Sequence, residues 1–399
     1  MPTQRRFFIK DAKKTILAAG VAVGLGAVLA SGALAADDVK PRVRDLGIEI
    51  GVLQPGKWNA ITDVEGVLVG QVSLIDDAKG MNTGVTAILP HAENVFQNKV
   101  PAGIFLGNAF GKMTGYPQVK ELGNLETPIV LTNTLNVAAG LDGIIDYTFS
   151  FPENADVRSV NGVVGETNDG GVNDIRSRFV KSSDVLAAIE GAKTGPVEEG
   201  VVGAGCGTVA FGFKAGIGTA SRVLPKSMGG WTVGVLVQSN FGGLLNVKGV
   251  EVGKTLGRYP YQKEIESADG SIMMIVATDA PLDGRNLERL AKRAFMGMTK
   301  SGGIASNGSG DFVIAFSTAK NLRVPHNADD LTLEEKKLVR NDDMTPIFMA
   351  AIEATEEAVL NSLFRAHDVT GFDGKTVTAL PVDQVLGMLR EHGVLKDAK

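Results

Sequence analysis

Residues 231–238 read Trp-Thr-Val-Gly-Val-Leu-Val-Gln, and residues 271–278 read Ser-Ile-Met-Met-Ile-Val-Ala-Thr. Both runs are short, apolar and rich in β-branched residues, and turn-forming residues bound them, which is typical of buried β-strands. Similar runs occupy residues 66–72 and 127–132. A strand that is apolar along its whole length needs a cover on both faces. The pattern therefore predicts sheets that are buried on both sides.

Helical spacing of apolar residues appears in three other segments, 184–190, 286–300 and 347–364. In the second segment the repeat at intervals of three and four is carried by Leu287, Leu290, Ala291, Ala294 and Met298. Such helices can lie on the faces of the predicted sheets, which indicates a layered α+β fold. No internal repeat or change of composition divides the chain, so we expect one structural domain.

The composition excludes several classes of protein. With 399 residues, 44% of them hydrophobic, the chain is long enough to bury a large core and is neither disordered nor collagen-like. Cys206 is the single cysteine, which rules out an internal disulfide, and the four histidines lack the spacing of a zinc site. The glycine-rich stretch around Gly203, Gly205 and Gly207 lacks the rest of a dinucleotide-binding fingerprint. We therefore expect neither a metal nor an organic cofactor.

The N-terminus has the features of an export signal. Arg5 and Arg6 precede an apolar run at residues 16–30 and an Ala-Leu-Ala sequence at residues 33–35. A charged start, a short apolar segment and an A-x-A site predict a cleaved signal peptide over residues 1–35, and the paired arginines favour the twin-arginine route. We expect a periplasmic mature protein; an uncleaved N-terminal anchor is the alternative.

Removal of residues 1–35 would make the chain more acidic than the full-length net charge of −5, because this segment is basic. An acidic protein without a basic block is a poor partner for nucleic acid or for an anionic membrane. No later segment reaches the length of a membrane-spanning helix.

A serine lies on a glycine turn directly before another predicted strand. The sequence Asn-Gly-Ser-Gly-Asp at residues 307–311 leads into Phe312, so the turn exposes Ser309 at the start of the strand. Taken alone, this pattern is also ordinary turn chemistry. It differs from the nucleophile elbow of α/β-hydrolases, in which a helix follows the serine.

Five segments, in order, identify a family resemblance. Residues 213–222, 234–242, 277–282, 307–311 and 353–358 closely resemble the DmpA family of self-processing aminopeptidases, which includes the β-peptidyl aminopeptidases. The resemblance extends from about Leu46 to Leu386. It implies a four-layer α/β/β/α sandwich of the N-terminal-nucleophile type. It also implies that the precursor cuts itself into a large (α) chain, residues 36–308, and a small (β) chain, residues 309–399.

The resemblance further implies the roles of individual residues. Ser309 would be the nucleophile, freed by cleavage after Gly308, Asn240 would supply an oxyanion donor, and Glu166 would bind the amino group of the substrate. A hydroxyl-x-glutamate pair on the helix behind the nucleophile would orient it. That helix carries Thr355-Glu356-Glu357, with threonine where serine is more usual. Thr355 with Glu357 matches the family spacing, and Glu356 is the alternative acid.

The implied chemistry agrees with the residues at the turn. Gly308 has no Cβ, so a hydroxyl can approach its carbonyl closely. Cleavage would free the Ser309 α-amine, whose usual pKa of roughly 7.7–8.0 makes it a base near neutral pH. The expected substrates are small peptides or amides with a free amino end, possibly β-peptides, and the expected assembly is a homotetramer of processed heterodimers. An acyltransferase that uses the same acyl-Ser309 and an inactive periplasmic binding protein are the alternatives.

Overall fold

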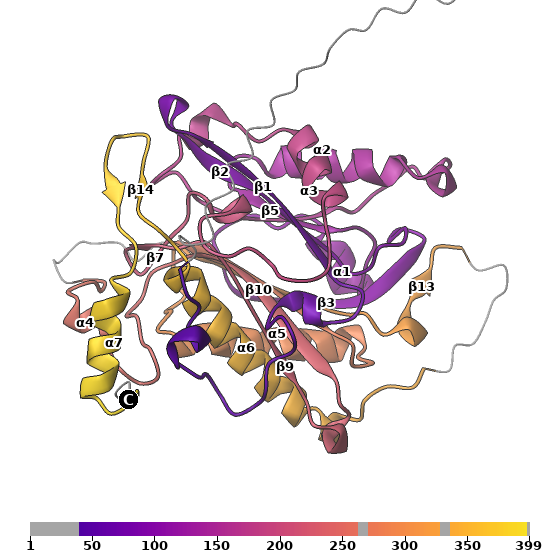
Figure 1. Cartoon of the computed structure of the whole chain (residues 1–399). Coiled ribbons are helices and arrows are strands. Elements are labelled where there is room, and N and C mark those ends of the chain that lie inside the picture. Colours follow the sequence, from indigo (N-terminus) through magenta and orange to yellow (C-terminus); the bar gives the residue numbers. More distant parts are fainter. Residues whose placement is uncertain (1–39, 262–269, 328–335, 397–399) are drawn as a thin grey trace, which may run out of the picture. The chain divides into compact units, whose positions relative to one another are not determined.

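The computed structural model of the chain describes residues 40–261, 270–327 and 336–396 (Figure 1). The predicted signal peptide, residues 1–35, lies outside the described residues. The α-helices are α1 (Tyr116–Leu122), α2 (Val137–Phe149), α3 (Ser182–Glu190), α4 (Val252–Thr255), α5 (Gly284–Lys300), α6 (Thr345–Phe364) and α7 (Val382–Glu391). Within the described ranges, no helix has both the length and the apolar character needed to cross a bilayer.

Most of the strands form two sheets. The smaller sheet has the order β1 (Leu68–Asp76), β2 (Met81–Leu89), β5 (Ile129–Asn133) and β6 (Val163–Thr167). The larger sheet has the order β13 (Val324–Pro325), β3 (Asn98–Ala109), β12 (Gly310–Ser317), β11 (Ser271–Thr278), β10 (Thr232–Asn240) and β9 (Ile217–Val223), and β4 (Asn124–Leu125) pairs with β3. Two short hairpins pair β7 (Val209–Ala210) with β8 (Phe213–Lys214) and β14 (Val369–Thr370) with β15 (Thr376–Val377).

The sheets and helices stack in four layers. Helices α2 and α3 cover the outer face of the smaller sheet, the inner faces of the two sheets pack together, and α5 and α6 cover the outer face of the larger sheet (Figure 1). The predicted strands at residues 127–132, 231–238 and 271–278 form β5, β10 and β11, and the three predicted helical segments form α3, α5 and α6. The α/β/β/α sandwich and the burial of its sheets on both sides are confirmed.

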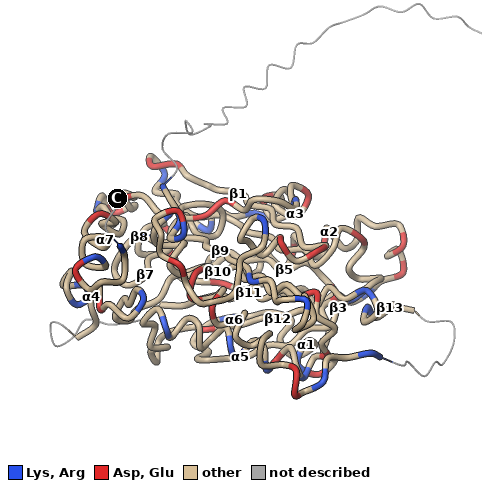
Figure 2. Tube along the Cα trace, turned by 60° about the horizontal axis from the view of Figure 1, so that its bottom comes forward, with Lys and Arg blue, Asp and Glu red and all other residues tan. Residues whose placement is uncertain are grey.

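The alternation of side chains along β12 explains this burial. Phe312, Ile314 and Phe316 point between the sheets, into the same core as Ile88 and Ile129. The intervening Val313 and Ala315 contact the core beneath α5 and α6. Successive residues of a strand point to opposite faces, so one uninterrupted apolar run supplies two cores. Charged residues are correspondingly rare in β10, β11 and β12, and Asp311 is the one that these three strands carry. Figure 2 colours the acidic and basic residues along the chain and labels these strands.

The strand β12 lies in the interior of the larger sheet. It pairs in parallel with β11 from Gly310 to Ser317 and antiparallel with β3 from Gly310 to Phe316. The pairing with β3 contains a bulge, because Asp311 pairs with Asn108 whereas Phe312 pairs with Leu106. Gly107 is therefore the extra residue, and a Cβ there would lie 2.2 Å from the ring of Phe295 on α5. The close approach of α5 requires glycine at this bulge.

A buried ionic network joins α6 to the N-terminal segment. Arg222, whose side chain is fully buried at the end of β9, contacts Glu353 at 3.1 Å and Glu357 at 2.7 Å. Arg44 contacts Glu357 at 2.9 Å, and Glu353 accepts hydrogen bonds from the backbone N–H groups of Val52 and Leu53. Each buried carboxylate is thus matched by cationic or N–H donors, as burial requires. This network fixes residues 42–53 against α6.

Replacement of Arg222 by methionine would leave two buried carboxylates short of a cation. We expect Arg222→Met to lower the free energy of unfolding by about 3–5 kcal/mol, the cost of breaking a buried ion pair by removal of one partner. The urea midpoint of unfolding measures this loss. Lys254→Met, which breaks an exposed pair with Glu251, is the matched control and should change stability by less than about 0.5 kcal/mol. Equal urea midpoints for the two variants would contradict the stabilising role of the buried Arg222 network.

Candidate active site

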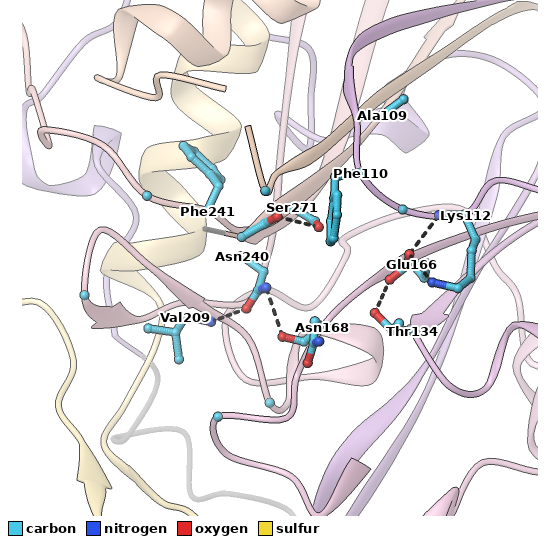
Figure 3. Close-up of a pocket in the computed structure, with 17 residues that line it drawn as sticks. Ala109, Phe110, Lys112, Thr134, Glu166, Asn168, Val209, Asn240, Phe241 and Ser271 are labelled. Atoms are coloured by element: carbon cyan, nitrogen blue, oxygen red, sulfur yellow. Dashed lines mark hydrogen bonds and ion pairs between the residues drawn. The ribbon is translucent and has the colours of Figure 1, made fainter. Parts of the chain in front are cut away.

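A cavity of about 760 Å³ opens at one end of the sandwich, between the two sheets (Figure 3). It lies where β6, β10, β11 and β12 begin or end. Gly308, Asn240 and Glu166, which come from distant parts of the sequence, all line it. The remaining lining residues are Ala109, Phe110, Gly111, Lys112, Thr134, Asn168, Gly171, Gly207, Val209, Gly212, Phe241, Gly242, Gly270 and Ser271.

The carboxylate of Glu166 forms the acidic wall of this cavity. Glu166 lies on β6 and is only 2% exposed. Its Oε1 accepts a hydrogen bond from the backbone N–H of Lys112 at 2.9 Å, and its Oε2 accepts one from the hydroxyl of Thr134. The Lys112 ammonium lies 3.8 Å from Oε1, although its own side chain is 56% exposed (Figure 3). A cation therefore already lies beside this carboxylate, and its exposed side chain can leave without loss of packing.

The side-chain amide of Asn240 is held in one orientation at the opposite wall. Asn240 ends β10, and its Oδ1 accepts a hydrogen bond from the N–H of Val209 at 2.9 Å. Its Nδ2 donates to the carbonyl of Asn168 at 3.0 Å (Figure 3). These two bonds determine which side of the amide carries the nitrogen. Because Nδ2 has two hydrogens, it can also donate to an oxygen in the cavity.

A buried lysine organises the loop that carries Val209. The ammonium of Lys214 donates to the carbonyls of Gly205, Thr208 and Ala215 at 2.7–3.1 Å. Burial lowers the pKa of Lys214 to about 7, and the three carbonyls satisfy its three donors. The fixed loop places the Val209 N–H against Asn240. This role of Lys214 is not evident from the sequence, because it depends on three carbonyls that only the folded loop brings together.

Ser309 lies just outside the strand ladder. Its backbone N–H donates to the carbonyl of Ser306 at 2.9 Å, and its carbonyl accepts from the N–H of Phe110 at 3.1 Å. The side chain is 2% exposed, and Gly308, not Ser309, lines the cavity. The Ser309 hydroxyl donates to Oδ1 of Asp311 at 2.8 Å. In the uncleaved chain the hydroxyl is therefore directed at a carboxylate.

Asp311 was not among the candidate site residues predicted from the sequence, but the structure makes it one, because it accepts the Ser309 hydrogen bond. Burial raises the pKa of Asp311 to about 6, and the hydrogen bond from Ser309 opposes this rise. A shifted carboxyl next to a hydroxyl nucleophile is characteristic of catalytic sites. The spacing of Ser309 and Asp311 could have indicated their contact, because residues i and i+2 of an extended chain share a face.

Thr355, Glu356 and Glu357 are not among the described residues that line the cavity, and the Ser309 hydroxyl donates to Asp311 and not to any of them. The Thr355 hydroxyl donates to the carbonyl of Ala351 within α6, and Glu357 belongs to the buried network with Arg222 and Arg44. Glu356 contacts Lys300 at 2.6 Å. Positions 355 and 357 are about 200° apart on a helix, so they face different neighbours. Their predicted role in orienting the nucleophile stays a prediction.

Within the described ranges, no group of three or more His, Cys, Asp or Glu side chains could hold a metal ion. None of the four histidines lines the cavity. The polar groups available there are therefore the Glu166 carboxylate, the Asn240 amide, the Lys112 ammonium and hydroxyls. Such a set can bind a cation and an oxyanion on opposite walls around the Gly308 backbone.

Sequence comparison finds close relatives over nearly the whole chain. The model of peptidase family S58 matches residues 59–377. The β-peptidyl aminopeptidase BapA of Sphingosinicella microcystinivorans is 42% identical over 400 residues, which cover 94% of this chain and 98% of the relative.

Solved structures give the same result. The β-aminopeptidase of a Burkholderia species superposes with a TM-score of 0.82 at 39% identity, over 89% of this chain and 100% of the relative. The L-aminopeptidase D-Ala-esterase/amidase of Ochrobactrum anthropi, described as a prototype serine aminopeptidase and a variant of the Ntn hydrolase fold, superposes with a TM-score of 0.82 at 36% identity. That match covers 90% of this chain and 100% of the relative.

Cys206 lies beside the buried lysine, and we expect it to be chemically inert. Burial raises the pKa of its thiol to about 11, so hardly any thiolate exists at neutral pH. Iodoacetamide at pH 7.5 should leave the native protein unlabelled and add one carbamidomethyl group after denaturation in urea. The mass of the intact protein measures both states. Rapid labelling of the native protein would show that Cys206 is accessible and reactive.

Proposed function

The chain belongs to peptidase family S58 and is a hydrolase of the aminopeptidase type, and on that basis we propose that it is a self-cleaving serine aminopeptidase with Ser309 as nucleophile. Its proposed substrates are small peptides or amides with a free amino end, β-peptides among them. The observation that carries this proposal is the convergence of Glu166, Asn240 and Gly308, the residue directly before Ser309, at one cavity.

The proposed reaction begins with cleavage of the chain itself. Attack of the Ser309 hydroxyl on the carbonyl of Gly308 gives an ester, and water hydrolyses this ester to leave Ser309 as a new N-terminus. The α-amine of Ser309 is then a base that ionises near neutral pH. It can accept the hydroxyl proton when Ser309 attacks a substrate carbonyl, and the acyl-enzyme is hydrolysed in turn.

The two walls of the cavity fit the two ends of such a substrate. The Glu166 carboxylate would bind the substrate ammonium in place of Lys112, and the second N–H of Asn240 would donate to the oxyanion that forms on the attacked carbonyl. The cavity is polar on both walls and large enough for a short peptide. Its size does not favour an α-amino over a β-amino backbone, so both remain within the proposal.

Two further properties belong to the proposal and rest on the sequence. Export to the periplasm by the twin-arginine route rests on residues 1–35, and this route carries folded proteins. Assembly into a homotetramer of processed heterodimers rests on the family resemblance.

Self-cleavage should depend on Ser309. We expect the purified wild-type protein to contain a small chain that begins Ser-Gly-Asp-Phe, and Ser309→Ala to remain a single chain. Ser227→Ala, which alters an exposed serine, is the control and should cleave normally. A denaturing gel followed by N-terminal sequencing of the small band gives the result. A wild-type protein that stays intact would overturn the proposed mechanism.

Glu166→Gln should weaken binding of substrates through their amino group. Loss of the charge removes a charge-assisted contact of about 1.5–3 kcal/mol, so KM for an amino-terminal amide should rise about 10- to 100-fold. The variant should still cleave itself, because Gly308 presents no ammonium. Steady-state kinetics with an aminoacyl p-nitroanilide tests this, with Glu121→Gln, an exposed acid, as control. An unchanged KM would remove Glu166 from substrate recognition.

A further inference from the structure

The uncleaved chain lacks the base that the cleaved enzyme would use. Before cleavage the Ser309 nitrogen is an amide, and its hydrogen is bonded to the Ser306 carbonyl at 2.9 Å. An amide nitrogen cannot accept the hydroxyl proton, and no histidine lines the cavity. Self-cleavage therefore needs a different proton acceptor next to Ser309.

Asp311 has the required position. Its Oδ1 accepts the hydrogen bond of the Ser309 hydroxyl at 2.8 Å, within the range expected of a general base. The side chain is fully buried, and within the described part of the chain its second oxygen, Oδ2, has no hydrogen-bond partner. A buried carboxylate is usually saturated with donors. The unused oxygen leaves this carboxylate able to take a proton.

Strand periodicity places Asp311 on the opposite side of the sheet from the substrate cavity. Asp311 shares a face with Val313, which packs beneath α5 and α6, whereas Phe312 points between the sheets. Glu166 and Asn240 line the cavity between the sheets. In the uncleaved chain, the Ser309 hydroxyl is therefore held by a group that is separate from the substrate-binding residues.

Asn108 holds the turn that contains the scissile bond. Its side-chain nitrogen donates to the carbonyls of Ser306 at 3.0 Å and Asn307 at 3.1 Å, and also to the carbonyl of Ser309. These carbonyls flank Gly308 on both sides. The bulge at Gly107 sets the direction of this side chain, as bulges beside active sites often do. The amide thereby restrains the backbone on each side of the bond that breaks.

We propose that Asp311 is the general base of self-cleavage and that Asn108 is the positioning residue of the scissile turn. This inference rests on the self-cleavage proposed above. The Ser309 proton passes to the Asp311 carboxylate as Oγ bonds to the Gly308 carbonyl carbon. The C–N bond then breaks, and the same proton passes to the departing nitrogen, which becomes the α-amine. Water adds to the ester carbon, Oγ departs with a proton, and Gly308 becomes a carboxyl terminus.

The pH dependence of cleavage follows from the surroundings of Asp311. Its pKa is about 6 because of burial, so the carboxylate form increases as pH rises through 6. In β11 there is no ionisable side chain, and Lys99 of β3 donates to the Phe96 carbonyl. The charged side chains of α5 and α6 have other partners. In α5, Arg285 contacts Asn341, Glu288 contacts Lys120 and Lys292, Arg289 contacts Asn286, and Arg293 lies over the Phe348 ring. Lys300 at the end of α5 contacts Glu356 of α6, and Glu353 and Glu357 of α6 contact Arg222.

The test is the rate at which newly made full-length chain cleaves itself. Four proteins are synthesised in a cell-free system and sampled over time on denaturing gels: wild type, Asp311→Asn, Asn108→Ala and Asp383→Asn. Asp383→Asn is the control, because it alters an exposed acid of the small chain. We expect Asp311→Asn to cleave about 10²- to 10⁴-fold more slowly, the usual contribution of a general base. Asn108→Ala should slow cleavage, and Asp383→Asn should match wild type. The wild-type rate should rise about tenfold per pH unit below 6 and level off above it.

The outcomes separate this inference from the function on which it rests. Uncleaved wild type would refute self-cleavage itself. Wild type that cleaves while Asp311→Asn cleaves equally fast would refute only the role of Asp311. If Asp311→Asn fails to fold, as circular dichroism would show, the wild-type pH profile decides: a flat rate between pH 5 and 7 overturns the proposal. Neutral hydroxylamine cleaves esters, and it should release no more small chain from folded Asp311→Asn than buffer alone, because formation of the ester is the step that is slowed. Accumulation of ester would place Asp311 after the first step and refute the assignment.

Discussion

The hydrogen bonds that hold β12 between β3 and β11 are the constraint on which the site depends. They begin at Gly310, which pairs with Ser271 on one side and Ala109 on the other. Ser309 is therefore the first residue outside a rigid ladder, and its position is fixed by the sheet. The same ladders would keep the small chain in place after cleavage, because β12 is an interior strand and the α6 network with Arg222 and Arg44 joins the two parts.

The layered core explains why the cavity lies where it does. Along most of their length the two sheets bury apolar side chains between them, but polar groups replace these toward the end where β10 stops. Gln238, for example, donates to the carbonyl of Thr132 and the hydroxyl of Thr167 across the sheets. Two residues further along β10, Asn240 faces the open cavity. Polar contacts between the sheets thus give way to open space at the end of β10, and the rigid strand holds Asn240 at the edge of that space.

Local patterns in the sequence were sufficient to predict the central strands and the main helices. The apolar run of β11 and the three-four repeat of α5 needed no knowledge of distant residues. The family resemblance supplied Glu166, Asn240 and Gly308, and the fold brings these three to one cavity. Asn108 was beyond reach, because its direction depends on a bulge in the pairing of two strands about 200 residues apart. Glu357 likewise pairs with two residues that are distant in sequence, Arg44 and Arg222.

The location of Asp311 also gives a physical reason for cleavage to proceed in one direction. Among the described residues of the uncleaved chain, the fully buried Asp311 carboxyl has one hydrogen-bond donor and no ion-pair partner, and burial disfavours its charged form. Cleavage after Gly308 would create an ammonium on Ser309, two residues away on the same chain. An opposite charge so close favours ionisation of the carboxylate and offsets its desolvation. The proposed reaction would thus convert an uncompensated buried acid into part of an ion pair, which stabilises the cleaved state relative to the precursor.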